Sequence, residues 1–125
     1  MKKRILVVED EKIVVSVIAD LLRNYEIIHA IDGIYALKIC KMQRPDLVIV
    51  DLSLPRMSGD EFMRNMREDE KLQGVPIILI SGTFSDKHNG EKLKEYPESD
   101  AVFSKPIDFD TFVKTIDSLV SSLQS

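Results

Sequence analysis

The chain has a single cysteine, no tryptophan and no long hydrophobic run. Cys40 has no second cysteine to pair with and no metal-ligand spacing around it, so we interpret it as a small core residue in a reducing cytoplasm. The longest apolar run, residues 75–80 with Pro76 inside it, is far too short to span a bilayer. The basic residues 2–4 are followed by four apolar residues and then by acids, so a signal-peptide core is missing. We expect no membrane insertion and a cytoplasmic location.

An excess of positive charge is also missing. The 125 residues include 17 basic and 21 acidic ones, a formal net charge of −4, which argues against direct binding of nucleic acid. The two histidines, His29 and His88, are isolated from other metal-ligand residues in the sequence. Apolar residues make up 44% of the chain, and repeats, low-complexity runs and linkers are lacking. This composition predicts one globular domain over residues 1–125.

Five short apolar runs rich in β-branched residues predict strands, at residues 5–8, 27–31, 47–50, 77–80 and 101–103. Three of them are continuous, as in strands covered on both faces. Apolar stripes at helical spacing separate or follow the runs, within residues 13–22, 36–40, 62–66 and 109–123. Residues 83–100 contain Gly90, Pro97 and few apolar side chains, so a helix there should be short and loosely packed. Alternating strands and helices predict an α/β fold of the (βα)5 type with parallel strands.

Polar residues follow four of the predicted strands. They are Glu9-Asp10-Glu11, Asp51, Ser81-Gly82-Thr83 and Ser104-Lys105-Pro106. Each group alone has an ordinary structural explanation, as a helix cap, a turn or a solvated side chain. In open parallel sheets, however, functional groups gather at the carboxyl ends of the strands.

These groups suit phosphoryl transfer when they are taken together. If the first and third strands are neighbours, the carboxylates of Glu9, Asp10 and Asp51 share one edge and repel one another unless a cation lies among them. Hard oxygen ligands of this kind favour Mg²⁺. Lys105 would add a positive charge and Ser81 a hydroxyl donor. The set therefore predicts a carboxylate nucleophile, a divalent cation and donors for phosphoryl oxygens.

Four motifs in this order resemble the receiver domain of two-component response regulators, the CheY-like fold. They are Val8-Glu9-Asp10, the stretch from Asp51 through Leu52-Ser53-Leu54-Pro55-Arg56-Met57-Ser58 to Gly59, Ile80-Ser81-Gly82, and Lys105-Pro106. The resemblance covers essentially the whole chain. It implies a doubly wound, flavodoxin-like sheet of five parallel strands in the order 2-1-3-4-5.

The resemblance also implies a role for each motif residue. Asp51 would be the phospho-acceptor, Asp10 would bind Mg²⁺ directly, Glu9 would act mainly through water, and Ser53 would supply a backbone carbonyl. Ser81 would be the switch hydroxyl and Lys105 the phosphoryl contact, held by a cis bond to Pro106, while Pro55 and Gly59 would shape the loop after the third strand.

Several functional expectations follow from the same resemblance. The phosphoryl group would come from a histidine kinase or a histidine phosphotransfer protein, with Mg²⁺ as cofactor and Mn²⁺ able to substitute. Phosphorylation would change the surface of helix 4, strand 5 and helix 5, and so act on a downstream protein target or an effector domain. The protein would not be an enzyme, beyond promoting its own phosphorylation and dephosphorylation.

One departure from the family pattern concerns the aromatic switch residue, expected three positions before the lysine. Val102 stands there, and the aromatic Phe103 comes one residue later. In a regular strand, the two side chains point to opposite faces of the sheet, with Val102 toward the switch cavity. A bulge before Lys105 would instead rotate Phe103 into that position. We favour the regular strand, because a bulge leaves a backbone group unpaired.

Three other protein classes fit less well. A flavodoxin needs a phosphate loop where Glu9-Asp10-Glu11 would repel phosphate, and the chain has no tryptophan for a flavin ring. A haloacid-dehalogenase-type phosphatase needs Asp-x-Asp, whereas Ser53 replaces the second acid. A structural interaction domain would use the acids only as caps. Within the receiver family, a single-domain regulator and a receiver belonging to a larger regulator remain as alternatives, although the last helix has Lys114 and no arginine, unlike receivers that dimerise to drive winged-helix DNA binding.

Overall fold

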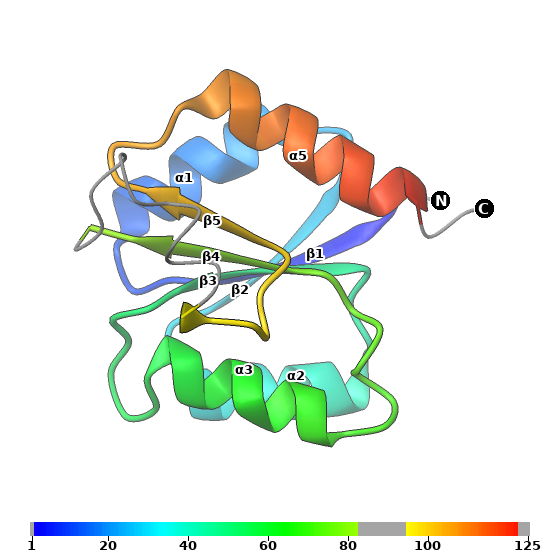
Figure 1. Cartoon of the computed structure of the whole chain (residues 1–125). Coiled ribbons are helices and arrows are strands. Elements are labelled where there is room, and N and C mark those ends of the chain that lie inside the picture. Colours follow the sequence, from blue (N-terminus) through cyan, green and yellow to red (C-terminus); the bar gives the residue numbers. More distant parts are fainter. Residues whose placement is uncertain (1, 83–94, 123–125) are drawn as a thin grey trace.

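A computed structural model describes residues 2–82 and 95–122 and shows a five-stranded parallel sheet between two layers of helices (Figure 1). The strand order is β2-β1-β3-β4-β5, as the resemblance to receiver domains implies. The strands are β1 (Arg4–Val8), β2 (Glu26–Ala30), β3 (Leu47–Asp51), β4 (Ile77–Ser81) and β5 (Ala101–Ser104). All five predicted strands are confirmed, and no strand end differs from the predicted one by more than one residue.

Helices cover both faces of the sheet. They are α1 (Lys12–Leu21), α2 (Gly33–Met42), α3 (Gly59–Glu68) and α5 (Phe109–Ser122). Figure 1 shows α1 and α5 on one face and α2 and α3 on the other. The weak helical pattern predicted within residues 83–100 falls mostly at 83–94, outside the described residues.

The strands β3 and β4 are buried at every position, which explains their continuous apolar sequence. Side chains that alternate along the strands point to opposite faces of the sheet and pack into two separate cores. One lies beneath α2 and α3 and contains Phe62, Met63 and Met66. The other lies beneath α1 and α5 and contains Ile18, Phe112 and Ile116. Cys40 is a free, buried thiol in the first core, as predicted.

The register of β5 is regular. Val102 pairs with Leu79, and Phe103 pairs with Ile80 in the next position, so no bulge separates them. Val102 joins the core beneath α2 and α3, whereas Phe103 joins the core beneath α1 and α5, where its ring meets Phe112 edge-on with centroids 5.2 Å apart. The predicted regular register is confirmed, and it places Val102 in the position of the aromatic switch.

The segment that enters β5 is tied to α3 by Arg67. Its guanidinium donates to the carbonyl oxygens of Gln73, Val75 and Glu98 and to Oδ2 of Asp100, at 2.7 to 3.1 Å. The same Asp100 oxygen accepts the backbone N–H of Ile77 at 2.8 Å. These bonds hold the starts of β4 and β5 together and so align the opposite ends of these strands.

Candidate functional site

The polar strand ends meet at the carboxyl edge of the sheet. Asp51 is the last residue of β3, Glu9 follows β1, and Lys105 follows β5. Because β1 and β3 are neighbours, one oxygen each from Glu9, Asp10 and Asp51 lies within 4.8 Å of the others. The structure thus brings together the three carboxylates that the sequence predicts as the metal site.

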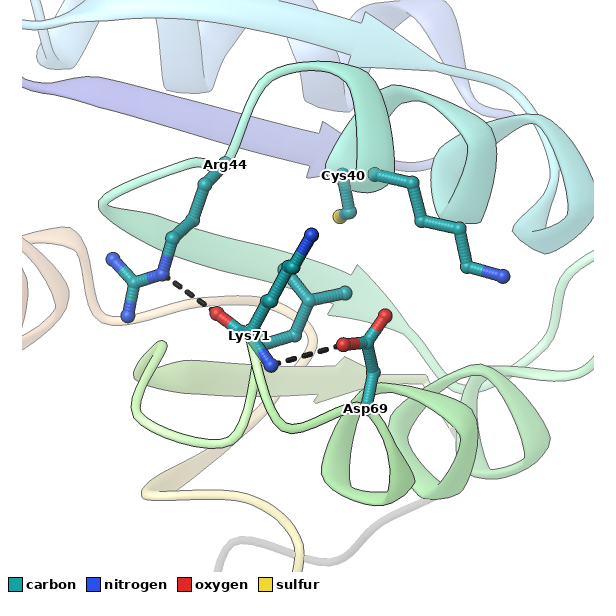
Figure 2. A pocket seen from close by; sticks show the side chains of 6 residues that line it. Cys40, Arg44, Asp69 and Lys71 are labelled. Carbon is teal, nitrogen blue, oxygen red and sulfur yellow. Dashed lines mark hydrogen bonds between the residues drawn. The ribbon is translucent and has the colours of Figure 1, made fainter.

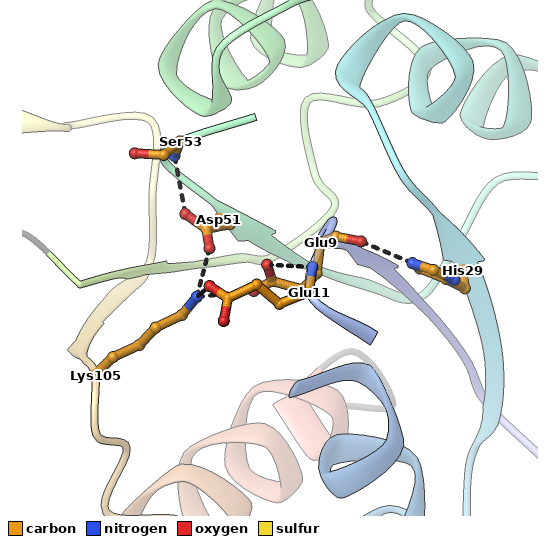
Figure 3. Close-up of polar contacts among 6 residues, drawn as sticks. All are labelled: Glu9, Glu11, His29, Asp51, Ser53 and Lys105. Atoms are coloured by element: carbon orange, nitrogen blue, oxygen red, sulfur yellow. Dashed lines mark hydrogen bonds and ion pairs between the residues drawn. The ribbon is translucent and has the colours of Figure 1, made fainter. Parts of the chain in front are cut away.

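Lys105 reaches into this cluster from the far strand of the sheet (Figure 3). Its Nζ lies 2.7 Å from Oδ2 of Asp51, 2.7 Å from Oε1 of Glu11 and 3.2 Å from Oε2 of Glu9. It donates hydrogen bonds to the two nearer oxygens. The predicted proximity of Lys105 and Asp51 is therefore present, with Glu11 as an additional partner.

Burial makes the charges of this cluster costly. Glu9 is fully buried and Asp51 is 3% exposed. Desolvation, reinforced by neighbouring Asp51, raises the pKa of Glu9 to about 7, although the Glu11 backbone N–H and Lys105 act in the opposite direction. Burial alone would lower the pKa of Lys105, but Asp51 and Glu11 outweigh it and hold that pKa above its ordinary value. The carboxylates of the cluster thus carry more negative charge than the single ammonium group of Lys105 neutralises.

A divalent cation fits this excess of negative charge. Oε2 of Glu9 is buried and accepts no hydrogen bond from the described residues, and it belongs to a set of hard oxygen ligands. A buried carboxylate oxygen without a donor is costly, and a coordinated ion or its bound water would satisfy it. The residues present therefore suit Mg²⁺, with Asp10 exposed at the outer side of the cluster.

The loop after β3 is packed closely against Asp51. A Cβ at Gly59 would lie 2.3 Å from the Asp51 carbonyl oxygen, so only glycine fits there. The Gly59 N–H also donates to the Leu52 carbonyl at 2.9 Å. Within the loop, Met57 donates to the Pro55 carbonyl at 2.7 Å, and Arg56 adopts a left-handed φ of 67°. These contacts agree with the predicted role of Pro55 and Gly59 in shaping the loop.

Ser53 lies two residues after the end of β3, and Ser81 ends the neighbouring strand β4. The backbone N–H of Ser53 donates to Oδ1 of Asp51 at 2.8 Å, and the predicted role of its carbonyl stays a prediction. Ser81 is buried at the end of β4, and its carbonyl accepts the N–H of Lys105 at 2.9 Å. The Lys105–Pro106 bond is cis, as predicted. Thr83, the last residue of the predicted group after β4, lies outside the described residues.

Two contacts near the site were not predicted. Glu11 was one of three consecutive acids without a role of its own, and His29 was treated as an isolated histidine. Glu11 pairs with Lys105, and the His29 ring Nε2 lies 2.7 Å from the Glu9 carbonyl oxygen (Figure 3). Three consecutive acids expected at the same sheet edge as Lys105 are a sequence signal that could have indicated the contact between Glu11 and Lys105.

A cavity lies at the opposite edge of the sheet, away from the carboxylate cluster. It measures about 630 Å³ and is lined by side chains near the ends of α2 and α3, namely Cys40, Lys41, Arg44, Asp69, Lys71 and Leu72 (Figure 2). Arg44 and Asp69 are engaged there with the backbone of Lys71. This cavity has no contact with the carboxylate cluster.

Comparison with known proteins identifies the family of the chain. The chain belongs to the response regulator receiver domain family, whose model matches residues 5–117. It is 32% identical, over 120 residues, to the polar-differentiation response regulator DivK of Brucella anthropi, covering 94% of this chain and 96% of that protein. Receiver domains are signalling domains of two-component systems, which interact with histidine kinases or phosphotransfer proteins and with downstream targets.

Solved structures show the same fold. The receiver domain of a sensor histidine kinase from Pseudomonas aeruginosa, with a magnesium ion coordinated in its active site cleft, superposes with a TM-score of 0.84 at 25% identity, over 97% of this chain and 99% of that chain. The chemotaxis response regulator CheY4 of Vibrio cholerae gives a TM-score of 0.82 at 25% identity, over 95% and 99% of the two chains. Among the described residues, no helix has the length and apolar character needed to cross a membrane.

Proposed function

We propose that Asp51 of this receiver domain accepts a phosphoryl group from a phosphohistidine of a histidine kinase or phosphotransfer protein. The observation that carries the proposal is the contact of Lys105 with Asp51, beside two further carboxylates, at the carboxyl edge of the sheet. A carboxylate oxygen of Asp51 attacks phosphorus, the P–N bond of the donor breaks, and its electron pair returns to the imidazole ring. The product is an acyl phosphate on Asp51.

The neighbouring groups have distinct roles in this proposal. Glu9, Asp10 and Asp51, with the Ser53 carbonyl, hold Mg²⁺, for which Mn²⁺ can substitute. When bound, the ion neutralises charge on the phosphoryl oxygens. Lys105 pairs with one of these oxygens and the Ser81 hydroxyl donates to another. The same groups let the domain promote its own phosphorylation and dephosphorylation without acting on a separate substrate.

An apolar surface beside Lys105 suits the phosphodonor protein. A shallow cavity of about 240 Å³ is lined by Lys105 together with side chains of α1 and the segment leading to α5, namely Ile13, Val14, Val17, Pro106, Ile107 and Phe109. Ile13 is 80% exposed. A donor must bring its histidine within bonding distance of Asp51, so it has to cover the surface that borders Lys105. We assign this surface to the donor.

The proposal also covers how the phosphorylated domain passes the signal on. Phosphorylation changes the surface of β5 and α5, which contacts a downstream protein target or an effector domain. The helix 4 part of the predicted surface lies outside the described residues. We further propose that residues 1–125 form one receiver domain that works in the cytoplasm without direct contact to nucleic acid. The family model, which matches residues 5–117, supports a receiver domain over that range.

Acetyl phosphate, a small-molecule phosphodonor, tests the acceptor. The protein incubated with acetyl phosphate and Mg²⁺ should gain the mass of one phosphoryl group, and a chelator should prevent the gain. Asp51→Asn should abolish it. Asp20→Asn, a matched change on the exposed side of α1, should leave it intact. If the Asp51→Asn variant gained the same mass as the wild type, Asp51 would not be the phospho-acceptor.

A further inference from the structure

Glu11 has no role in the proposed function, yet it accepts one of the two hydrogen bonds that the Lys105 ammonium group donates to described residues. Three carboxylate oxygens surround Nζ, at 2.7, 2.7 and 3.2 Å. A phosphoryl group on Asp51 brings its oxygens to Lys105 in place of the Asp51 carboxylate oxygen and adds negative charge, so the other two carboxylates beside Nζ repel it. The structure shows which of these two is able to turn away.

Glu9 and Asp51 are held in place. Glu9 is fully buried, and its Oε1 accepts the Glu11 backbone N–H at 3.1 Å. The Asp51 side chain is 5% exposed and accepts the Ser53 N–H. Releasing Glu9 from Lys105 would leave a buried negative charge without its cation, which is strongly unfavourable. Asp51 is the acceptor itself and carries the phosphoryl group to Lys105.

Glu11 is the replaceable partner. Its side chain is 62% exposed, and Lys105 is the partner of its carboxylate within the described part of the chain. A carboxylate this exposed regains hydration when it turns outward, so its departure costs little. Figure 3 shows Glu11 extending beside Asp51 toward the Lys105 ammonium group.

We propose that Glu11 is a positioning residue that occupies the place of the phosphoryl group on Lys105 in the unphosphorylated protein and competes with it. The inference rests on the proposed function. Before phosphorylation, Glu11 keeps the flexible lysine side chain at the site. On phosphorylation, the phosphoryl oxygen replaces the Glu11 carboxylate, which turns into solvent. Glu11 thereby sets how strongly the site retains a phosphoryl group.

Binding of beryllofluoride, a phosphoryl analogue, measures this competition. Calorimetric titrations at saturating Mg²⁺ compare the wild-type protein with Glu11→Gln, which keeps the size of the side chain and removes its charge. Since an exposed ion pair of this kind shifts an equilibrium by roughly two- to fivefold, Glu11→Gln should bind beryllofluoride tighter by about that factor. The gain should shrink at high salt, which screens exposed charges.

Two further variants separate competition from other effects. Asp20→Asn removes one negative charge from the exposed side of α1, the helix that follows Glu11, and should bind like the wild type. Glu11→Asp retains the charge and should return the affinity toward the wild-type value, with melting temperatures unchanged throughout. Equal affinity of Glu11→Gln and wild type, or an equal gain in Asp20→Asn, would overturn the inference while leaving the proposed function intact. Failure of the wild type itself to bind beryllofluoride would overturn both.

Discussion

At the scale of single residues, the site concentrates negative charge that the protein alone neutralises incompletely. Glu9 shows this most clearly, because it is fully buried and its Oε2 accepts no hydrogen bond from the described residues. Lys105 lies 3.2 Å from that oxygen but bonds to Asp51 and Glu11 instead. The folded state therefore carries an electrostatic cost that a bound cation would relieve.

Stability should accordingly depend on Mg²⁺ through Glu9. At a concentration about a hundredfold above its dissociation constant, Mg²⁺ should stabilise the wild-type protein by roughly 2.7 kcal/mol, measured by thermal unfolding. Glu9→Gln should lose most of this gain, because a neutral amide is a weaker ligand. Without Mg²⁺, the variant should melt above the wild type, since a buried charge has been removed.

Glu68→Gln provides the control for that experiment. Glu68 is an exposed residue at the end of α3 and is not among the cluster carboxylates. Its replacement should leave both the melting temperature and the response to Mg²⁺ unchanged. An equal response to Mg²⁺ in wild type and Glu9→Gln would argue against the cluster as the ion's site.

At the scale of elements, the connection from β3 to α3 decides how Asp51 is presented. The helix begins at Gly59, after Ser58 as its N-cap, and Gly59 packs directly on the Asp51 backbone. The close approach, rather than an unusual φ, requires the glycine, because no positive φ is found at the described glycines. The start of α3 and the acceptor are therefore coupled through backbone contacts.

Gly59→Ala should disturb both stability and phosphorylation. The added Cβ would lie 2.3 Å from the Asp51 carbonyl oxygen, so the backbone has to shift. We expect a loss of roughly 1–3 kcal/mol in the free energy of unfolding in urea, the usual cost of overpacking, with slower phosphorylation by acetyl phosphate. Gly74→Ala is the matched control, since its Cβ would lie 3.5 Å from the flexible Arg44 side chain. Similar losses in both variants would contradict the argument.

At the scale of the whole molecule, the two cores on opposite faces of the sheet decide which side chains can respond to the site. Val102 belongs to the core beneath α2 and α3, and Phe103 to the core beneath α1 and α5. A β-branched valine has a stiff χ1 and less volume than an aromatic ring. An inward swing of Phe103 would require it to leave Phe112 and cross the plane of the sheet.

Activation should therefore proceed without an aromatic flip. We expect nuclear Overhauser contacts between the rings of Phe103 and Phe112 in both the free and the beryllofluoride-bound protein. The response should instead appear at Ser81 and in the backbone that follows β4. A Phe103 ring that contacts Ser81 only in the bound state would show this expectation to be wrong.

The sequence by itself determined the strands and the members of the acidic site. Continuous apolar runs have a strong preference for burial on both faces, so β3 and β4 were predictable from local pattern alone. The positions of Glu9, Asp10, Asp51 and Lys105 followed because parallel strands deliver their carboxyl ends to one edge. The cis bond before Pro106 was also predicted, although from family resemblance rather than from local pattern.

Only the tertiary structure decided the contacts between these parts. Glu11 and Lys105 are 94 positions apart, and their pairing depends on the packing of two loops and on rotamers that local pattern does not encode. The same holds for His29 against the Glu9 carbonyl. The sequence favours a regular strand that places Val102 and Phe103 on opposite faces of the sheet. Only the pairing of β5 with β4 decides it, because a shift of one residue would exchange the two faces.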